Sequence, residues 1–302
     1  MRYVRSSLLL ALVGSAVAAS AAEVAVLKSS DSPAWRPAID NLRRSASAHT
    51  LTEYDLRGDR AEADRVIASL KGKAAILVTL GPLAAQAAKE LAPEIPQVFC
   101  MVQDPVRLGL VGLPNITGVA FSIPIKNQLA AFRLVNPRGV RIGVVYNDAN
   151  TGRLVEEAQK AAAVVRLSLV VRPVTSDKEV PEALRTLLRG ADAVDALWIP
   201  PDPTLLGDES RRYVLAETLK SGKPVYSFSA ALVSEGALVS NGPELASIGD
   251  QAGDLVNRIA GGEKSKIEML VPRAELVVNK KIADKLKIEI PADALRAANK
   301  VL

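Results

Sequence analysis

The sequence predicts an α/β protein built from two doubly wound parallel sheets. Short β-branched runs alternate with segments of helical spacing, and the alternation occurs twice along the chain. Continuous apolar strands separated by amphipathic helices are typical of parallel sheets that are covered on both faces. Hydrophobic residues make up 49% of the 302 residues and charged residues 24%, which is an ordinary globular composition and excludes a disordered chain.

Four strands with helices between them are predicted in the first half. The apolar run 24–27 begins the series, and Trp35, Ile39 and Leu42 then share one helical face. The elements that follow are expected as a strand at 50–56, a helix around 63–70, a strand at 75–78, a helix that begins at Pro82 and a strand at 98–102. Proline is favoured in the first turn of a helix, which supports the start at Pro82.

The second half repeats the pattern, beginning with a helix that opens at Pro124. Strands are expected at 140–146, 169–171, 194–199 and 224–228, and helices around 154–165, 184–188, 213–219 and 244–260. The last helix carries a single apolar stripe at Leu245, Ile248, Ala252, Leu255 and Ile259. No Gly/Ser-rich or charged linker separates the halves, so we expect lobes that several short crossing segments join.

Residues 1–21 are typical of a signal peptide. Arg2 and Arg5 precede an apolar stretch that is too short to span about 30 Å of hydrocarbon, and the small residues 19–21 provide a cleavage site. An uncleaved anchor is the alternative. No cysteine lies near the cleavage point, so we expect a periplasmic protein without a lipid anchor. The single Cys100, in a strand expected to be buried, is compatible with that oxidising compartment.

Composition and missing motifs exclude several classes of function. The net charge is +5, but 38 basic residues are interleaved with 33 acidic ones, so no basic stripe for nucleic acid is present. The chain has neither a dinucleotide fingerprint nor a P-loop, and one Cys and one His cannot form a zinc cluster. We therefore expect no cofactor and no metal. His49 lies in a helix-to-strand connection, where a solvated histidine is favoured over a catalytic one. The sequence does not exclude a catalytic pair of carboxylates.

In open parallel sheets, ligands bind where the carboxyl ends of strands meet helix N-termini. This rule selects candidate ligand-binding residues directly after the predicted strands: Ser29, Trp35, Thr79, Gly81, Pro82, Asp104, Tyr146, Asn147, Asp202, Phe228 and Ser229.

Five of the candidates have a plainer alternative. Thr79 beside Gly81 suits a ligand carboxylate or caps the next helix, and Asp202 suits a ligand ammonium or caps a helix. Asp104 before a proline favours a turn or an interlobe contact over direct ligand binding. The aromatic residues at 146 and 228 suit stacking on an apolar ligand group or core packing.

The sequence resembles the substrate-binding proteins of ABC transporters, of the tryptophan/tyrosine type. The resemblance rests on segments in the family's order at residues 82–88, 104–111, 115–119, 143–147, 200–204 and 276–281. It implies two Rossmann-like lobes joined by three crossing strands near Ser122, near 239–241 and near 270–272, which close on a ligand. It also implies delivery of that ligand to an ABC permease in the inner membrane. We expect a first lobe at 22–122 and 241–270, and a second lobe at 123–240 and 271–302.

Two departures from the family pattern leave the ligand open. Residues 241–244 read Asn-Gly-Pro-Glu where relatives carry a Val-Asp-Tyr type of stretch, and Phe228-Ser229-Ala230 lacks the Asp that relatives often have there. An amino acid is thus one candidate among small amphiphilic metabolites. We expect a monomeric, non-enzymatic binding protein. The alternatives are a sensory module that feeds a membrane receptor, which neighbouring genes would reveal, and an exported enzyme, which turnover would reveal.

Overall fold

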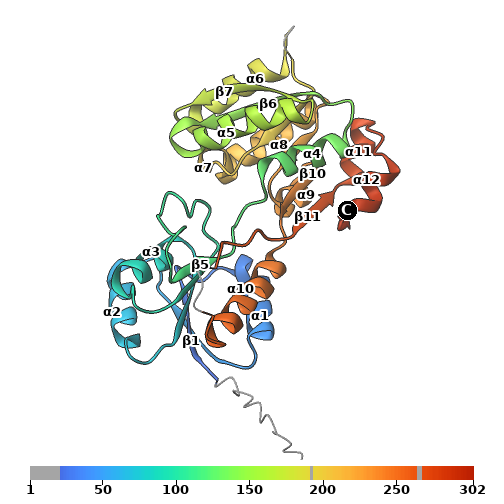
Figure 1. The fold of residues 1–302 in the computed structure, drawn as a ribbon. Helices are drawn as coiled ribbons and strands as arrows, with labels where there is room; N and C mark the ends of the chain where they lie inside the picture. Colours follow the sequence, from blue (N-terminus) through green and yellow to red (C-terminus); the bar gives the residue numbers. More distant parts are fainter. Residues whose placement is uncertain (1–20, 191–192, 264–266) are drawn as a thin grey trace, which may run out of the picture.

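The computed structural model describes residues 21–190, 193–263 and 267–302. They form two α/β bodies, each around one sheet, and segments of the chain cross between them (Figure 1). We call the body around strands β1 to β5 the first lobe and the body around β6 to β12 the second lobe. Apart from Ala21, the predicted signal peptide lies outside the described residues. Within the described ranges, no helix is long and apolar enough to cross a membrane.

The first lobe contains a five-stranded sheet in which every pair is parallel, in the order β2-β1-β3-β4-β5. Its strands are β1 (Glu23–Lys28), β2 (Thr50–Asp55), β3 (Ile76–Leu80), β4 (Gln97–Cys100) and β5 (Ile116–Gly118). Its helices are α1 (Arg36–Ser45), preceded by the 3-10 turn η1 (Pro33–Trp35), α2 (Arg60–Leu70), α3 (Pro82–Leu91) and α10 (Leu245–Ala260). One face of the sheet is covered by α1 and α10, and the other by α2 and α3.

The helix α10 belongs to the first lobe although it follows most of the second lobe in the sequence. It packs closely against α1 because both helices present small residues at their contact. A Cβ atom on Gly249 would lie 2.0 Å from the carbonyl oxygen of Ala38, and one on Gly253 would lie 2.4 Å from Cβ of Ser45. Ile248, in the predicted apolar stripe of this helix, is buried. The apolar stripe and the close contact between α10 and α1 together stabilise α10 in the first lobe.

The second lobe contains a seven-stranded sheet in the order β12-β11-β10-β9-β8-β6-β7. Its strands are β6 (Arg141–Asn147), β7 (Ser168–Val174), β8 (Ala196–Ile199), β9 (Val225–Ser227), β10 (Val239–Pro243), β11 (Ala274–Val278) and β12 (Lys300–Val301). Helices α4 (Ile125–Val135), α5 (Asp148–Val164), α11 (Lys280–Leu286) and α12 (Ala292–Ala297) pack on one side. The 3-10 turn η2 (Asp177–Glu179) leads into α6 (Val180–Leu188), which covers the other side with α7 (Pro203–Leu206), α8 (Asp208–Lys220) and α9 (Ala230–Glu235).

One pair in this sheet is antiparallel, which differs from the all-parallel expectation. The strand β10 runs toward the first lobe and leaves the sheet after Pro243. The chain later returns from the first lobe and enters β11 at Ala274, opposite Pro243. Because β10 exits and β11 enters at the same edge of the sheet, β11 has to run in the opposite direction. The direction of β11 is not readable from its apolar run at 276–278, and the two-residue β12 exists through its pairing with β11.

The crossings can be located from the strand pairing. The first lies between Val119, which forms an isolated bridge with Leu270, and the start of α4. The second follows Pro243, because Asn241 and Gly242 pair with β11 and remain in the second sheet. The family resemblance implied a crossing near 239–241, but these residues pair with β11 and the strand continues to Pro243. The third lies between Leu270 and β11. The division at 241 and 271 as a domain boundary stays a prediction.

Candidate functional site

The topology turns the carboxyl ends of the parallel strands of both sheets toward the opposite lobe. The first crossing leaves the carboxyl end of β5, and all other strands of the first sheet run parallel to β5. The second crossing leaves the carboxyl end of β10, and β6 to β9 run parallel to it. The strand-end loops of the two lobes therefore lie on the two faces that are turned to each other (Figure 1).

Three predicted residues of the first lobe lie together there. The hydroxyl oxygen of Ser29, after β1, accepts a hydrogen bond from the N–H of Ala84 at 3.0 Å, so this serine caps α3 from another loop. Gly81 has a φ of 86°, and a Cβ atom on it would lie 2.7 Å from Oγ of Ser29 and 3.0 Å from the Trp35 ring. Ser29, Trp35 and Gly81 thus form one compact group at the N-terminus of α3. Glycine is required here by both backbone and space.

Thr79 and Pro82 flank this group, but the two residues differ in exposure. Thr79 is fully buried, and its hydroxyl oxygen accepts a hydrogen bond from Nε2 of Gln97 at 3.0 Å. The side chain neither caps α3 nor reaches the surface, because strand alternation turns it into the lobe. Pro82 is exposed as the first residue of α3, as the sequence predicts.

Asp104 takes both of the plainer roles considered for it. Its Oδ1 accepts a hydrogen bond from the N–H of Arg107 at 3.0 Å, which forms a turn after β4. Its Oδ2 lies 2.6 Å from Nη2 of Arg153 on α5, in the second lobe. This ion pair links the two lobes directly. Arg153 carries no local signal of such a role, since its partner is 49 residues away in the sequence.

The carboxyl end of β6 contributes Tyr146 and Asn147. Asn147 is the N-cap of α5, and its Oδ1 accepts a hydrogen bond from the N–H of Ala149 at 3.1 Å. Tyr146 is partly buried against the cluster under α4 and α5. Burial raises its pKa, and the nearby carboxylates of Asp148 and Glu156 raise it further, so the phenol is neutral at physiological pH.

Asp202 is fully buried and is held by four donors from the protein itself. Oδ2 accepts from the N–H of Asn147 at 2.6 Å and from the hydroxyl of Thr151 at 2.7 Å. Oδ1 accepts from the N–H of Thr204 at 2.9 Å and from Nδ2 of Asn150 at 3.2 Å. The carboxylate thus caps α7 and holds the start of α5, which matches the alternative to binding an ammonium group. Its sequence signal, an acid between two prolines, is the same for both roles.

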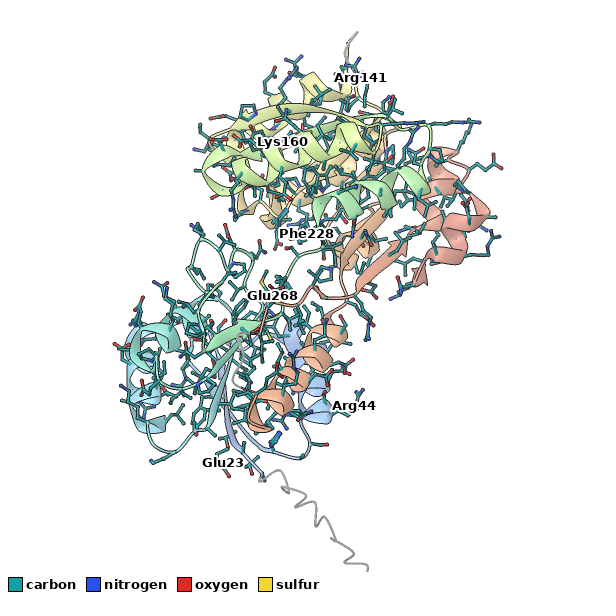
Figure 2. All side chains as sticks on the ribbon, viewed as in Figure 1. Glu23, Arg44, Arg141, Lys160, Phe228 and Glu268 are labelled. Carbon is teal, nitrogen blue, oxygen red and sulfur yellow. The ribbon has the colours of Figure 1, made fainter. Side chains whose placement is uncertain are left out.

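Phe228 and Ser229 follow β9. Ser229 is the N-cap of α9, and its Oγ accepts a hydrogen bond from the N–H of Ala231 at 3.3 Å. Phe228 is half-buried against the cluster under α6 to α9, and Figure 2 shows it on the side of the second lobe that faces the first. Its carbonyl oxygen lies so near β10 that a Cβ atom on Gly242 would approach it to 2.2 Å. Glycine at 242 therefore allows this aromatic residue to sit at the interlobe face.

A network of polar contacts ties the second and third crossings together. Arg273 lies 2.9 Å from Glu244 and 3.2 Å from Asp250 through its guanidinium group. The N–H of Glu244 donates to the carbonyl oxygen of Arg273 at 2.8 Å, and Nε2 of Gln251 donates to that of Val271 at 3.1 Å. Sequence reasoning missed these residues because the contacts join segments that are distant in the chain.

The described residues offer little for a metal. No group of three or more His, Cys, Asp and Glu side chains in the described parts of the chain is placed to hold an ion. Cys100 is fully buried, and burial raises the pKa of its thiol to about 12, so it is an inert core residue. What the interlobe faces do offer is hydroxyls, helix N-termini and half-buried aromatic rings.

The fold and the placement of these groups define a class of two-lobed solute-binding proteins. The family model for ABC transporter substrate binding proteins matches residues 46–302. The chain belongs to this family, as the resemblance in the sequence predicted.

Known relatives agree with this assignment. A tyrosine-binding protein of Clostridioides difficile (strain R20291) is 25% identical over 196 residues, which cover 62% of this chain and 55% of that protein. The chain thus spans about half the length of this curated relative.

Solved structures show the same fold. The ABC domain in complex with L-Trp from Streptococcus pneumonia has a TM-score of 0.71 at 24% identity, covering 94% of this chain and all of that one. A ligand-free, open substrate binding protein with adhesive properties from Clostridium difficile has a TM-score of 0.81 at 20% identity, covering 93% and 99%.

Proposed function

We propose that this protein is the periplasmic solute-binding component of an ABC importer, and that it binds a small amphiphilic metabolite between its lobes. The observation that carries the proposal is the convergence of strand-end loops from two parallel sheets on facing surfaces. A ligand held there contacts both lobes at once, so binding favours the arrangement in which the lobes are closed. An ABC permease in the inner membrane would then recognise the closed form.

The first lobe supports binding of an anionic group. Ser29 uses its hydroxyl oxygen as an acceptor for Ala84, and a hydroxyl in that role can still donate its own proton to a ligand oxygen. The helix dipole at the N-terminus of α3 also stabilises a bound carboxylate, by about 0.3–1 kcal/mol. Ser29 and the N-terminus of α3 lie side by side, so a carboxylate is the group that this part of the site suits best.

Aromatic side chains support binding of an apolar group. Trp35 borders the Ser29 and Gly81 group in the first lobe, and Phe228 lies on the side of the second lobe that is turned to the first (Figure 2). Tyr146 is partly exposed at the end of β6. Asp202 and Thr79 act indirectly in this proposal: Asp202 positions the start of α5, and Thr79 supports the strand before Gly81. An amino acid with a large side chain fits these features, and the names of the relatives agree with it.

The observed lobe arrangement suits a protein without ligand. The TM-score is higher for the relative that is described as ligand-free and open, at 0.81, than for the one in complex with L-Trp, at 0.71. We propose a monomer that is exported through the signal peptide at 1–21, cleaved after Ala21 and left without a lipid anchor. Relatives often have an Asp after the position of Phe228, and this chain lacks it. An amino group on the ligand would therefore have to bind other residues.

The proposal is tested by native mass spectrometry of the freshly purified exported protein, followed by calorimetry with L-tryptophan and L-tyrosine. We expect a copurifying small molecule or a saturable one-to-one affinity for one of these amino acids. Ser29→Ala should weaken that affinity about fivefold to tenfold, the value of one hydrogen bond to a charged group. Ser69→Ala is the matched control, because Ser69 also bonds to the backbone, on α2. Turnover of the bound molecule, or equal effects of both variants, would contradict the proposal.

A further inference from the structure

A second hollow lies at the opposite end of the second lobe from the interlobe face. It has a volume of about 500 Å³ and is lined by the loop 136–139 before β6, by Asp195 before β8, by 222–224 before β9 and by residues 287–289 and 291 after α11. Three of these segments precede parallel strands, so the hollow lies at the amino ends of those strands. We call it the amino-end pocket. Its volume lies within the range of small-molecule sites.

The charge around the amino-end pocket is predominantly positive. Arg138, Lys223 and Lys287 line it, and none of them forms an ion pair with another described residue. The carboxylates in the lining are Asp195 and Glu289. Asp195 is already stabilised, because its Oδ2 accepts hydrogen bonds from the N–H groups of Val140 and Arg141 at 3.0 and 2.8 Å. The pocket lining therefore has three basic side chains without an ion-pair partner among the described residues. Of its two carboxylates, that of Asp195 already accepts hydrogen bonds from the backbone.

The remaining walls of the pocket are apolar. They consist of Pro137, Pro224, Ile288 and Pro291. The rigid rings and the isoleucine cannot satisfy a polar ligand group, but they can contact a flat or branched hydrocarbon part. A ligand with one anionic end and one apolar end matches both halves of the lining.

A glycine lets two buried side chains pack closely beneath the pocket. Nδ2 of Asn136 donates to the hydroxyl oxygen of Tyr226 at 2.8 Å, and both residues are buried. A Cβ atom on Gly139 would lie 2.7 Å from each of these two atoms. On the rim, Lys287 has a φ of 55°, a left-handed conformation that favours glycine, yet the residue is a lysine. Lys287 is the C-cap of α11, where a left-handed residue commonly ends a helix, and this helix end places the lysine beside the hollow.

We propose that the amino-end pocket is a second binding site, for a small organic anion such as an aromatic or branched carboxylate. Its cations bind the anionic group, and its proline and isoleucine walls contact the hydrocarbon part. The site is separate from the interlobe site, because the strands of the second sheet lie between the two. Occupation of the pocket does not require the lobes to close, since every residue that lines it belongs to the second lobe.

The test uses the full exported chain and benzoate as the probe, with benzamide as its neutral isostere, followed by NMR titration. We expect saturable benzoate binding with a dissociation constant of about 1 mM, shift changes at Gly139, Gly222 and Ile288, and no such changes with benzamide. The double variant Arg138→Glu/Lys223→Glu should weaken benzoate binding about tenfold or more. A melting curve like that of the wild type shows that the variant is folded.

Two controls separate this proposal from the interlobe function. Lys160→Glu reverses one charge, as each substitution of the double variant does, but on the exposed face of α5 (Figure 2), and it should leave benzoate binding unchanged. Ser29→Ala should also leave it unchanged. Equal binding of benzamide, an equal loss in Lys160→Glu, or no saturable binding would overturn the amino-end site. Loss of benzoate binding in Ser29→Ala alone would show that benzoate occupies the interlobe site, which would overturn this proposal and leave the proposed function standing.

Discussion

The ion pair between Asp104 and Arg153 should set part of the balance between separated and closed lobes. Its atoms lie 2.6 Å apart, but the Arg153 side chain is 71% exposed and that of Asp104 is 27% exposed. Solvent therefore screens the pair, and its contribution is about 0.2–1 kcal/mol. If closure breaks the pair, Arg153→Ala raises the closed population by about 1.4-fold to 5-fold, because only the separated arrangement loses stability.

The assay measures the distance between the lobes in solution. Spin labels on introduced cysteines at Lys71 and Lys160, which are exposed on different lobes, report the distance distribution by pulsed electron resonance. Cys100 is buried and should not react, so labelling is selective. Arg153→Ala is preferable to a change at Asp104, because Asp104 also forms a turn with Arg107.

The control is Arg185→Ala, which removes an exposed arginine that pairs within the second lobe. It should leave the distance distribution unchanged. The reasoning is refuted if Arg153→Ala gives the wild-type distribution at low ionic strength, or shifts it toward longer distances. The first outcome would mean that the pair contributes nothing, and the second that it stabilises the closed arrangement.

Three further variants probe the structure itself. Cys100→Val should remove an alkaline loss of stability: the folded pKa of the thiol is raised from 9.0 to about 12, so its contribution is complete below pH 9 and is lost as the pH rises toward 12. The wild type should thus lose about 1.4 kcal/mol more per pH unit than the variant in urea unfolding between pH 9 and 11, and parallel slopes would contradict the assignment. Asp202→Ala should lower the free energy of unfolding by about 3 kcal/mol, because it leaves the four donors to this buried carboxylate without their acceptor, and a loss under about 1 kcal/mol in urea titration would argue against that role. Gly249→Val should cost about 1–3 kcal/mol by separating α1 from α10, with Gly261→Ala, just beyond the end of α10, as a milder control in the same thermal melts.

The fold was accessible to sequence reasoning because strand and helix patterns are local. The run at 24–27 falls within β1, and Pro82 begins α3 as predicted. The family resemblance added the lobes and crossings. The strands after residue 270 were not predicted in detail, because β12 has two residues and exists through pairing with β11.

The site was only partly accessible. The strand-end rule selected Ser29, Trp35 and Gly81 among its candidates, and the structure brings these three together. It also selected Thr79 and Asp202, whose side chains are buried and bonded within the protein. The strand-end rule selects residues by their position after a strand, and it cannot tell whether a polar side chain points to solvent or into a lobe. It therefore selects supporting residues together with surface ones.

By itself, the sequence determined the alternation of strands and helices, the burial of its apolar runs and the starts of several helices. These features depend on interactions between residues within a few positions of one another, so the local sequence pattern is enough to predict them. Only the tertiary structure decided that Asp104 meets Arg153, that Asp202 is enclosed by Asn147 and its neighbours, and that β11 runs antiparallel. Such contacts depend on the path of the chain, which crosses between the lobes three times. This path brings together side chains that are far apart in the sequence, so no local pattern predicts their contact.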